Sequence, residues 1–256
     1  MKKELLEFKK HVEKYDFKNL GIKFKYNHSI GVMKIGNSIA KKLKLKDNEV
    51  YMVTLACLLH DIGRFDQLKI YDTFNDKKSF DHGDYAYNYI KKNNYLRKYT
   101  DDTTYDTAIL KSIKYHNKFK IGKCNEIELL FSKIVRDADK VDILLNDGFK
   151  KFSEYETNEL EISDSVYNKI LNEKDISYDD TNNKLDRILL GLAMIYDINF
   201  DCSFSFIKGK GIVKRVIGFL KAKNKNKDTL DKLNIIEKKL EEYIERRVNN
   251  GKKVWS

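Results

Sequence analysis

The segment Leu55–Phe65 reads LACLLHDIGRF, in which an apolar run leads into an adjacent histidine and aspartate and then a glycine. Inward-facing residues upstream of that pair recur at spacings of three and four, which is typical of one face of a helix. They are Val50, Thr54, Cys57 and Leu58. We expect Asp47 or Asn48 to begin this helix, the His-Asp pair to lie in its last turn, and Gly63 to end it.

A second helical stripe precedes this segment. Asn27 can cap a helix, and His28 lies on the buried face of that helix, one turn before its first apolar residue. The apolar residues are Val32, Ile35, Ile39 and Leu43. The chain contains no proline and only 12 glycines, so few residues would interrupt helices. We therefore predict an all-α protein.

Helical patterns also follow the segment. Residues 64–82 show no clear period, and we expect a loop there with little regular structure. A helix is expected from about residue 84 to residue 96. The next stripe ends at His116, and a later one begins at Asn125 and is flanked by Asp139. The residues of these two stripes are Tyr105, Ile109, Ser112 and Ile113, and then Ile127, Phe131, Ile134, Ala138 and Val141.

The second half of the chain is less informative. Residues 185–198 and 230–248 have the pattern of amphipathic helices, and SFSFIKGKG at 203–211 is expected to separate helices. Because no repeat or low-complexity linker marks a boundary, we treat residues 1–256 as a single domain.

Composition excludes several classes of protein. A chain of 256 residues can bury a sizeable core without disulfides, and three cysteines without CxxC spacing predict a reduced, cytoplasmic protein. No apolar stretch reaches the ~20 residues that cross a bilayer, so we expect no membrane partner. The N-terminal segment MKKELLEFKK lacks the apolar run of a signal peptide. The net charge of +11 would attract phosphate-bearing partners, but its scattered lysines favour a solvated surface over nucleic-acid binding.

Four of the five histidines lie at or beside the buried faces of the expected helices. They are His28, His60, His82 and His116. One such histidine is usually a hydrogen-bonded core residue. Here carboxylates accompany the histidines, because Asp61 follows His60 directly, and Asp137 and Asp139 end a later stripe. Burying several carboxylates without cations is costly, and divalent metal ions would remove that cost.

The order of these residues resembles a known family signature. His28, His60-Asp61, His82, His116 and Asp139 follow the H…HD…H…H…D pattern of the HD-domain superfamily of metal-dependent phosphohydrolases. LACLLHDIGRF resembles that family's apolar helix running into HD-I-G-[KR], and IVRDADKVDIL at 134–144 resembles its late A-D-[KR]-x-D segment. The resemblance implies an HD-domain-like helical bundle with its metal-binding core at about residues 26–145 and a helical C-terminal extension over 146–256.

The resemblance also assigns roles to these residues. The ligands of a first metal are matched by His28, His60, Asp61 and Asp139, and those of a second by His82, His116 and a bridging Asp61. Imidazole nitrogens and carboxylate oxygens bind Zn, Mn, Fe, Ni or Co, and the mixture does not choose among them. We therefore expect two divalent ions that convert a water to hydroxide and hold the phosphoryl oxygens.

Two basic residues could contact a substrate. Arg64 directly follows the HDIG sequence and resembles the Lys or Arg that many family members carry there. It could meet a substrate phosphate through charge-assisted hydrogen bonds, and a surface salt bridge is an equal alternative. Lys140 could act similarly, although a solvated lysine is favoured. We count Asp61 and Arg64 as the candidate catalytic residues.

Several other polar residues lie close to the signature. Asp142 lies one helical turn beyond Asp139 and could orient a ligand or pair with a basic residue, and Asp81 could accept the second imidazole N–H of His82. Structural roles are favoured for Asp142 and for Asp137, and a solvated loop position for Asp81. We interpret His11, in a charged N-terminal helix, as a surface residue.

These features favour a metal-dependent phosphohydrolase that cleaves a phosphomonoester or phosphodiester bond of a small phosphorylated metabolite, preferably a nucleotide, by attack of a metal-bound hydroxide. His116-Asn117 stands where cyclic-dinucleotide phosphodiesterases and CRISPR-associated nucleases of the superfamily carry two histidines, which weakens both of those assignments. A mixed-valent diiron oxygenase, which uses the same ligand order, stays open as an alternative. A nuclease acting on nucleic acid is a further alternative. A non-catalytic interaction module is disfavoured because all six ligand residues are present.

Overall fold

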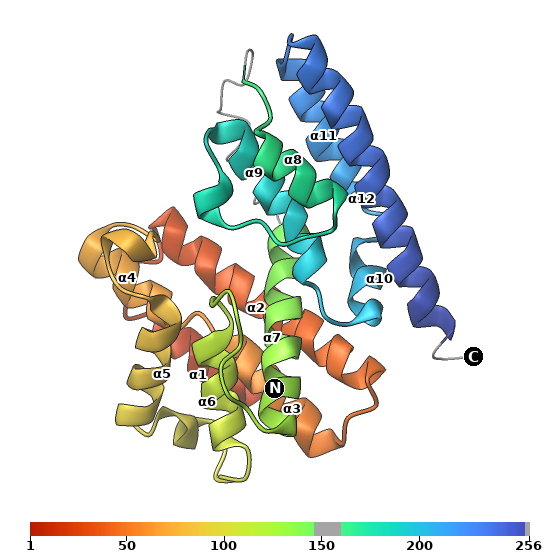
Figure 1. Cartoon of the computed structure of the whole chain (residues 1–256). Helices are drawn as coiled ribbons and strands as arrows, with labels where there is room; N and C mark the ends of the chain where they lie inside the picture. Colours follow the sequence, from red (N-terminus) through yellow and green to blue (C-terminus); the bar gives the residue numbers. More distant parts are fainter. Residues whose placement is uncertain (146–159, 254–256) are drawn as a thin grey trace. The chain divides into compact units, whose positions relative to one another are not determined.

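The computed structural model describes residues 1–145 and 160–253, and every regular element in those residues is a helix (Figure 1). The predicted all-α fold is therefore confirmed. The chain forms two compact units, Met1–Asp142 and Ile143–Ser256, and the first of them contains all six candidate ligands. The treatment of the whole chain as one domain stays a prediction.

The first unit is built around a helix that is apolar on every side. Its elements are α1 (Lys2–Val12), α2 (Leu20–Lys42), α3 (Asp47–Leu59), α4 (Gly63–Tyr71), η1 (Asp76–Lys78), α5 (His82–Lys92), η2 (Tyr95–Lys98), α6 (Asp106–Tyr115) and α7 (Glu126–Leu145). In α3 every residue from Met52 to Leu59 is buried, as expected of a core helix. Helix α3 packs against α2 and α6. A Cβ at Gly36 of α2 would overlap Cys57 Sγ, so this glycine permits the close approach of α2 to α3.

Helix α2 begins earlier than the sequence predicted. Asn19, not Asn27, is the N-cap, and its side-chain oxygen accepts hydrogen bonds from the backbone N–H groups of Gly21 (2.8 Å) and Ile22 (3.4 Å). The prediction was wrong because Ile22 is buried and the Tyr26 ring stacks on Phe8, so the buried stripe extends two turns upstream. This earlier start adds a helical turn just before His28.

Residues 64–82 are also more regular than predicted. They contain α4, the short turn η1 and the first residue of α5, because Phe65 and Gln67 are fully buried and anchor α4. Gly63 begins α4 and does not end α3. A Cβ at position 63 would lie 2.9 Å from the His82 carbonyl oxygen, so this glycine allows α4 to approach α5. The close packing of α4 on α5 thus fixes the position of His82, the first residue of α5.

The second unit is also helical in the residues that the structure describes. Its elements are α8 (Asp164–Leu171), η4 (Tyr178–Asp180), α9 (Lys184–Ala193), η5 (Met194–Asp197), η6 (Asp201–Ser203), α10 (Phe204–Ile207), α11 (Ile212–Lys223) and α12 (Lys227–Lys253). The helix predicted over 185–198 becomes a 3-10 turn after Ala193. The predicted break at 203–211 holds α10 and two left-handed glycines, Gly209 (φ +79°) and Gly211 (φ +59°).

The sequence composition also predicted no membrane-spanning segment and reduced cysteines. Among the described residues, no helix combines the length and apolarity that a membrane span requires. The three cysteines are free thiols. The cytoplasmic location inferred from them stays a prediction.

His11 of α1 is buried and not, as predicted, on the surface. Only 3% of the residue is exposed, and its ring packs against aromatic side chains, namely Tyr15, Phe65, Tyr89 and Tyr95. Neither ring nitrogen has a hydrogen-bond partner among the described residues. Burial lowers the pKa of His11 to about 4, so this histidine is a neutral core residue at pH 7.

This burial predicts a specific pH dependence of stability. Between pH 6.5 and about 4 the unfolded chain binds a proton at His11 that the folded chain does not, so the free energy of unfolding falls as the pH is lowered through this window. His11→Phe should remove this loss. When the pH is lowered from 7.5 to 5, the free energy of unfolding of the variant should rise by about 2 kcal/mol relative to that of wild type. Urea unfolding in chelator measures the difference, and an equal difference at both pH values would contradict the assignment.

Candidate metal centre

The six candidate ligands come from five places in the first unit and lie together. His28 is on α2, His60 and Asp61 directly follow α3, His82 begins α5, His116 directly follows α6, and Asp139 is on α7. Each of the first five residues is at most 4% exposed, and the Asp139 side chain is 15% exposed. The juxtaposition of helix ends explains how His60 and Asp61, although adjacent, can both face one centre.

Asp61 lies between two pairs of histidines. Its Oδ2 atom is 3.5 Å from Nε2 of both His28 and His60. Its Oδ1 atom is 3.5 Å from Nε2 of both His82 and His116. The two oxygens of one carboxylate therefore face two different sets of imidazoles, which is the arrangement of a bridging ligand.

Asp139 completes one of these sets. Its Oδ1 atom is 3.0 Å from His28 Nε2 and 3.6 Å from His60 Nε2. We define the first half-site as His28, His60, Asp139 and Asp61 Oδ2, and the second half-site as His82, His116 and Asp61 Oδ1. Ligand atoms of His28, His60 and Asp139, and likewise those of His60, Asp61 and His116, lie within 4.8 Å of one another.

In each of the four histidines, the Nδ1 atom forms a hydrogen bond with a group outside the centre. Nδ1 of His28 donates to Asp142 Oδ2, and that of His82 to Asp76 Oδ2, each at 2.7 Å. The other two donate to backbone carbonyls, His60 to Cys57 at 2.7 Å and His116 to Ile113 at 2.6 Å. Because these carboxylate and carbonyl partners accept hydrogen bonds only, Nδ1 carries a hydrogen in each ring, and all four Nε2 atoms point into the centre.

These Nε2 atoms approach one another closely in pairs. The Nε2 atoms of His60 and His28 are 3.3 Å apart, and those of His82 and His116 are 3.0 Å apart. Two Nε2 lone pairs at such a distance repel each other unless a proton or a metal ion lies between them. The donor set therefore fits divalent metal ions, and its mixture of nitrogen and oxygen ligands suits Zn, Mn, Fe, Ni or Co.

The protonation states of Asp61, Asp139 and His82 agree with metal binding. Burial alone would raise the pKa of Asp61, but Lys25 and the histidines around it hold the pKa well below its ordinary value. The pKa of Asp139 is likewise lowered, because hydrogen bonds from His28 and His60 outweigh burial. Burial lowers the pKa of His82 to about 4 despite its hydrogen bond to Asp76. Charged carboxylates and neutral imidazole are the metal-binding forms.

His28 differs from His82 in this respect. Burial lowers its pKa, but hydrogen bonds to Asp139 and Asp142 more than offset burial and raise the pKa to about 9. A proton at His28 Nε2 and a metal ion would compete for the same lone pair. Binding of an ion to the first half-site should therefore release this proton.

Lys25 is a residue at the centre that the sequence analysis missed. Its Nζ atom is 2.6 Å from Asp61 Oδ2, and its side chain is 13% exposed. Lys25 lies one helical turn before His28 on α2 and so shares its face. The signal was this spacing of three residues, which the wrong helix start at Asn27 concealed.

The Arg64 guanidinium is held by hydrogen bonds to other residues of the first unit. Its Nη1 atom donates to Gln67 Oε1 at 2.5 Å, to the Phe74 carbonyl at 2.7 Å and to Asp76 Oδ1 at 2.8 Å. Gln67, which is fully buried, donates to the same Asp76 oxygen at 2.9 Å. Arg64 and Gln67 thus hold the carboxylate that orients His82, while Arg64 Nε lies 3.7 Å from Asp61 Oδ1.

Asp76, not Asp81, accepts the hydrogen bond from His82. Asp81 instead caps α5, where its side chain accepts from the Asp84 backbone N–H at 2.9 Å. Asn117, at the departure from the two-histidine pattern, donates to Asp81 Oδ2 at 3.0 Å. Asp76 was missed because it lies in the segment predicted to be an irregular loop.

The two other residues near Asp139 are both buried. Asp142 orients His28, and a Cβ at Gly31 would overlap Asp142 Oδ1, so Gly31 makes room for that carboxylate. Lys140 is only 9% exposed and is not the solvated lysine that was predicted. The polar surroundings of the first half-site therefore extend one turn along α7.

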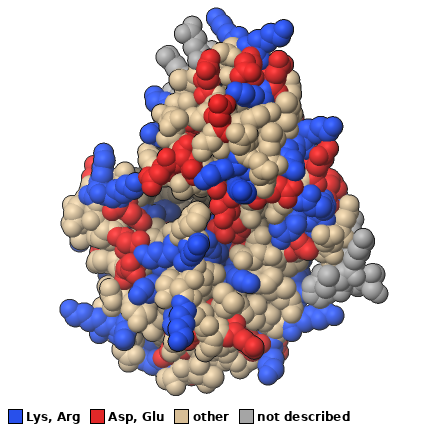
Figure 2. Space-filling model, viewed as in Figure 1, with Lys and Arg blue, Asp and Glu red and all other residues tan. Residues whose placement is uncertain are grey.

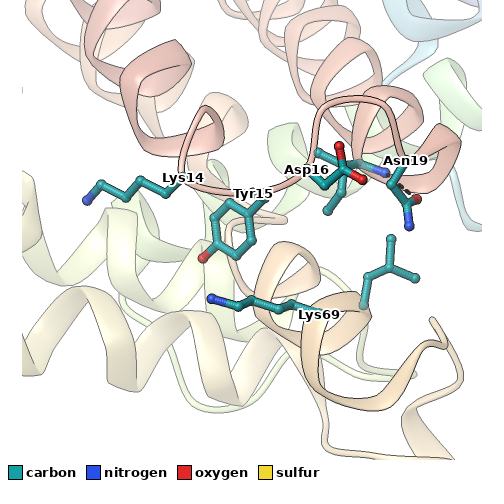
Figure 3. A pocket seen from close by; sticks show the side chains of 7 residues that line it. Lys14, Tyr15, Asp16, Asn19 and Lys69 are labelled. Carbon is teal, nitrogen blue, oxygen red and sulfur yellow. Dashed lines mark hydrogen bonds between the residues drawn. The ribbon is translucent and has the colours of Figure 1, made fainter.

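A pocket of about 200 Å³ lies elsewhere in the first unit (Figure 3). Its lining residues are Lys14, Tyr15, Asp16, Asn19, Ile22, Leu68 and Lys69, and none of them is a candidate ligand. In Figure 3 the Lys14 side chain points away from the others, while Lys69 approaches the Tyr15 ring, with Nζ 5.8 Å from its centroid. The lining contains one carboxylate, that of Asp16, and no histidine or cysteine.

Comparison with known families matches residues 26–144 to the HD domain. The predicted resemblance to HD domains is confirmed over this range, and the ligand variant within that superfamily stays a prediction. The matched range contains all six candidate ligands. No curated protein and no solved structure matches the chain.

The role of Asp76 can be tested by Asp76→Asn. The amide removes the negative charge that holds the Nδ1 hydrogen of His82, so affinity for an ion at the second half-site should fall about 10- to 100-fold. Competition with a chromophoric chelator measures the affinity. Asp72→Asn is the control, because Asp72 is exposed and its left-handed conformation (φ 50°) suits asparagine. Unchanged affinity in Asp76→Asn would show that this hydrogen bond does not matter for binding.

Proposed function

We propose that this protein is a metal-dependent phosphohydrolase that cleaves a phosphomonoester or phosphodiester bond of a small phosphorylated metabolite, preferably a nucleotide. The observation that carries the proposal is the position of Asp61, whose two oxygens face two histidine pairs. Two divalent ions held by these residues would activate a water and neutralise phosphoryl oxygens. The described part of this centre contains no exposed Ser or Cys nucleophile, and Cys57, next to it in sequence, is fully buried.

Lys25 and Phe24 support a phosphate ester with an aromatic group. The Phe24 ring is 44% exposed and lies parallel to the His28 ring, with centroids 6.3 Å apart. Lys25 Nζ lies 5.8 Å from the Phe24 centroid and 5.6 Å from that of Phe74. A cation between aromatic rings, beside the bridging carboxylate, suits a phosphate attached to a base that stacks on Phe24.

The role of Arg64 in this proposal differs from the contact with substrate phosphate that the sequence suggested. Because its guanidinium binds Asp76 and lies beside Asp61, we assign it to holding the centre, and we assign the first contact with substrate phosphate to Lys25. Lys25 would then bind the substrate before and during the reaction. Arg64 would keep His82 and Asp61 in place.

The proposed function is tested on protein that is stripped of metal and reloaded with Mn, Fe, Co, Ni or Zn. Each form is assayed against phosphomonoesters, phosphodiesters and nucleotides, with and without oxygen. We expect hydrolysis without oxygen, and loss of both bound metal and turnover in His60→Ala and Asp61→Ala. Turnover that requires iron and oxygen would instead support the diiron oxygenase, and an Asp61→Ala protein with full metal content would contradict its bridging role.

The role of Lys25 is tested by Lys25→Met. Loss of a charge-assisted hydrogen bond should lower kcat/KM about 10- to 100-fold, chiefly through a higher KM. Lys23→Met is a matched control, since Lys23 is exposed and lies two residues earlier on the same helix. Equal kinetics for the two variants would refute the assignment of Lys25 to the phosphate.

The nuclease alternative receives less support. On the face shown in Figure 2, basic side chains alternate with acidic ones and do not form one continuous basic surface. Binding of nucleic acid by the phosphate backbone normally uses such a surface. On this face, the net charge of +11 does not gather into a surface that favours a nucleic-acid substrate.

A further inference from the structure

The end of α6 positions a ligand, His116, whose Nδ1 hydrogen bond stays within its own helix. His28 and His82 are oriented by carboxylates from elsewhere in the chain, Asp142 and Asp76. His116, in contrast, donates Nδ1–H to the carbonyl of Ile113 in its own helix. The direction of His116 Nε2 therefore depends on where the end of α6 lies.

The carbonyl groups at this helix end meet a buried arginine from α7. Arg136 is 4% exposed, and its Nη1 atom donates to the backbone oxygens of Tyr115 (3.1 Å), His116 (3.5 Å) and Lys118. The last carbonyls of a helix lack partners within the helix and carry a partial negative charge. A guanidinium is planar, permanently charged and rich in donors, so it can serve several such carbonyls at once.

The position of Arg136 on α7 links this helix end to the other half of the centre. Asp139, a residue of the first half-site, lies three residues further along the same helix, about one turn away. One helix thus supplies a ligand residue to the first half-site and a support for His116 in the second. We propose that Arg136 is a positioning residue that sets the separation of the two half-sites by fixing His116 relative to Asp139. The inference rests on the proposed two-metal function.

Arg136→Lys is the substitution that tests this positioning role. An ammonium group keeps the charge, but it lacks the planar fork that reaches several carbonyls. In Arg136→Lys we expect metal bound per chain to fall from two ions to one, with the first half-site still loaded. After gel filtration, elemental analysis gives the stoichiometry. In protein loaded with Mn(II), electron paramagnetic resonance should change from a spin-coupled pair to an isolated ion.

Arg97 supplies the matched control. It anchors the other end of α6 through Asp106 Oδ1 and the Asp101 carbonyl, away from the candidate ligands. Arg97→Lys should destabilise α6 to a similar degree and still bind two coupled ions. Thermal unfolding of both variants shows whether their stabilities are comparable.

Each outcome decides the matter. Two coupled ions in Arg136→Lys, or parallel loss of both ions in the two variants, would overturn the role of Arg136 and leave the proposed function standing. Fewer than two ions in wild type would overturn the two-metal function and this inference together. If Arg136→Lys does not fold, Arg136→Ala is measured with and without millimolar guanidinium. Recovery of the second ion on addition of guanidinium supports the proposal, and no recovery counts against it.

Discussion

A buried carboxylate shared by four imidazoles is the constraint on which the centre depends. Asp61 is 2% exposed and has both oxygens surrounded by Nε2 atoms. Burying such a charge without a counter-charge is far costlier than burying a neutral polar group. Lys25 meets part of this requirement at Oδ2, and a proton on His28 balances the neighbouring Asp139. At the second half-site, Oδ1 faces the neutral His82 imidazole, and Arg64 Nε lies 3.7 Å away, farther than the 2.6 Å between Lys25 Nζ and Oδ2, so that side has the stronger need for a cation.

The helical bundle meets this constraint by bringing helix ends together. Side chains at helix ends can approach from several directions, whereas residues on one helix share a limited face. Close contacts at glycine allow the approach, as at Gly31 beside Asp142 and Gly63 beside the His82 carbonyl. Hydrogen bonds outside the centre then fix each imidazole so that Nε2 faces inward. Ligands that face one point from several sides would be difficult to place on the face of one helix.

The sequence predicted the all-α fold and the set of residues that converge. Apolar periodicity identified α6 and α7, and the apolar run before His60 identified α3, which is buried on every side. The family signature added the grouping into two half-sites, which spacing alone does not reveal. The fold class and the HD-domain resemblance are therefore confirmed, while the metal-binding roles of these residues stay predictions.

The residues that orient and balance the centre were harder to predict. Asp76 and Gln67 lie in a segment whose short helices have no clear period, so their contacts depend on tertiary packing. Lys25 was missed with the first two turns of α2, and His11 was misjudged because charged neighbours surround it in sequence while aromatic rings surround it in space. Asp142 and Arg136 act through partners distant in sequence.

The central claim is that Asp61 joins two cation sites, and anomalous X-ray scattering tests it most directly. Crystals of protein loaded with Mn or Zn are measured above and below the absorption edge of the metal. We predict two anomalous peaks about 3.5–4 Å apart, one on each side of the Asp61 carboxylate. A single peak, or peaks remote from Asp61, in fully loaded protein would contradict the account.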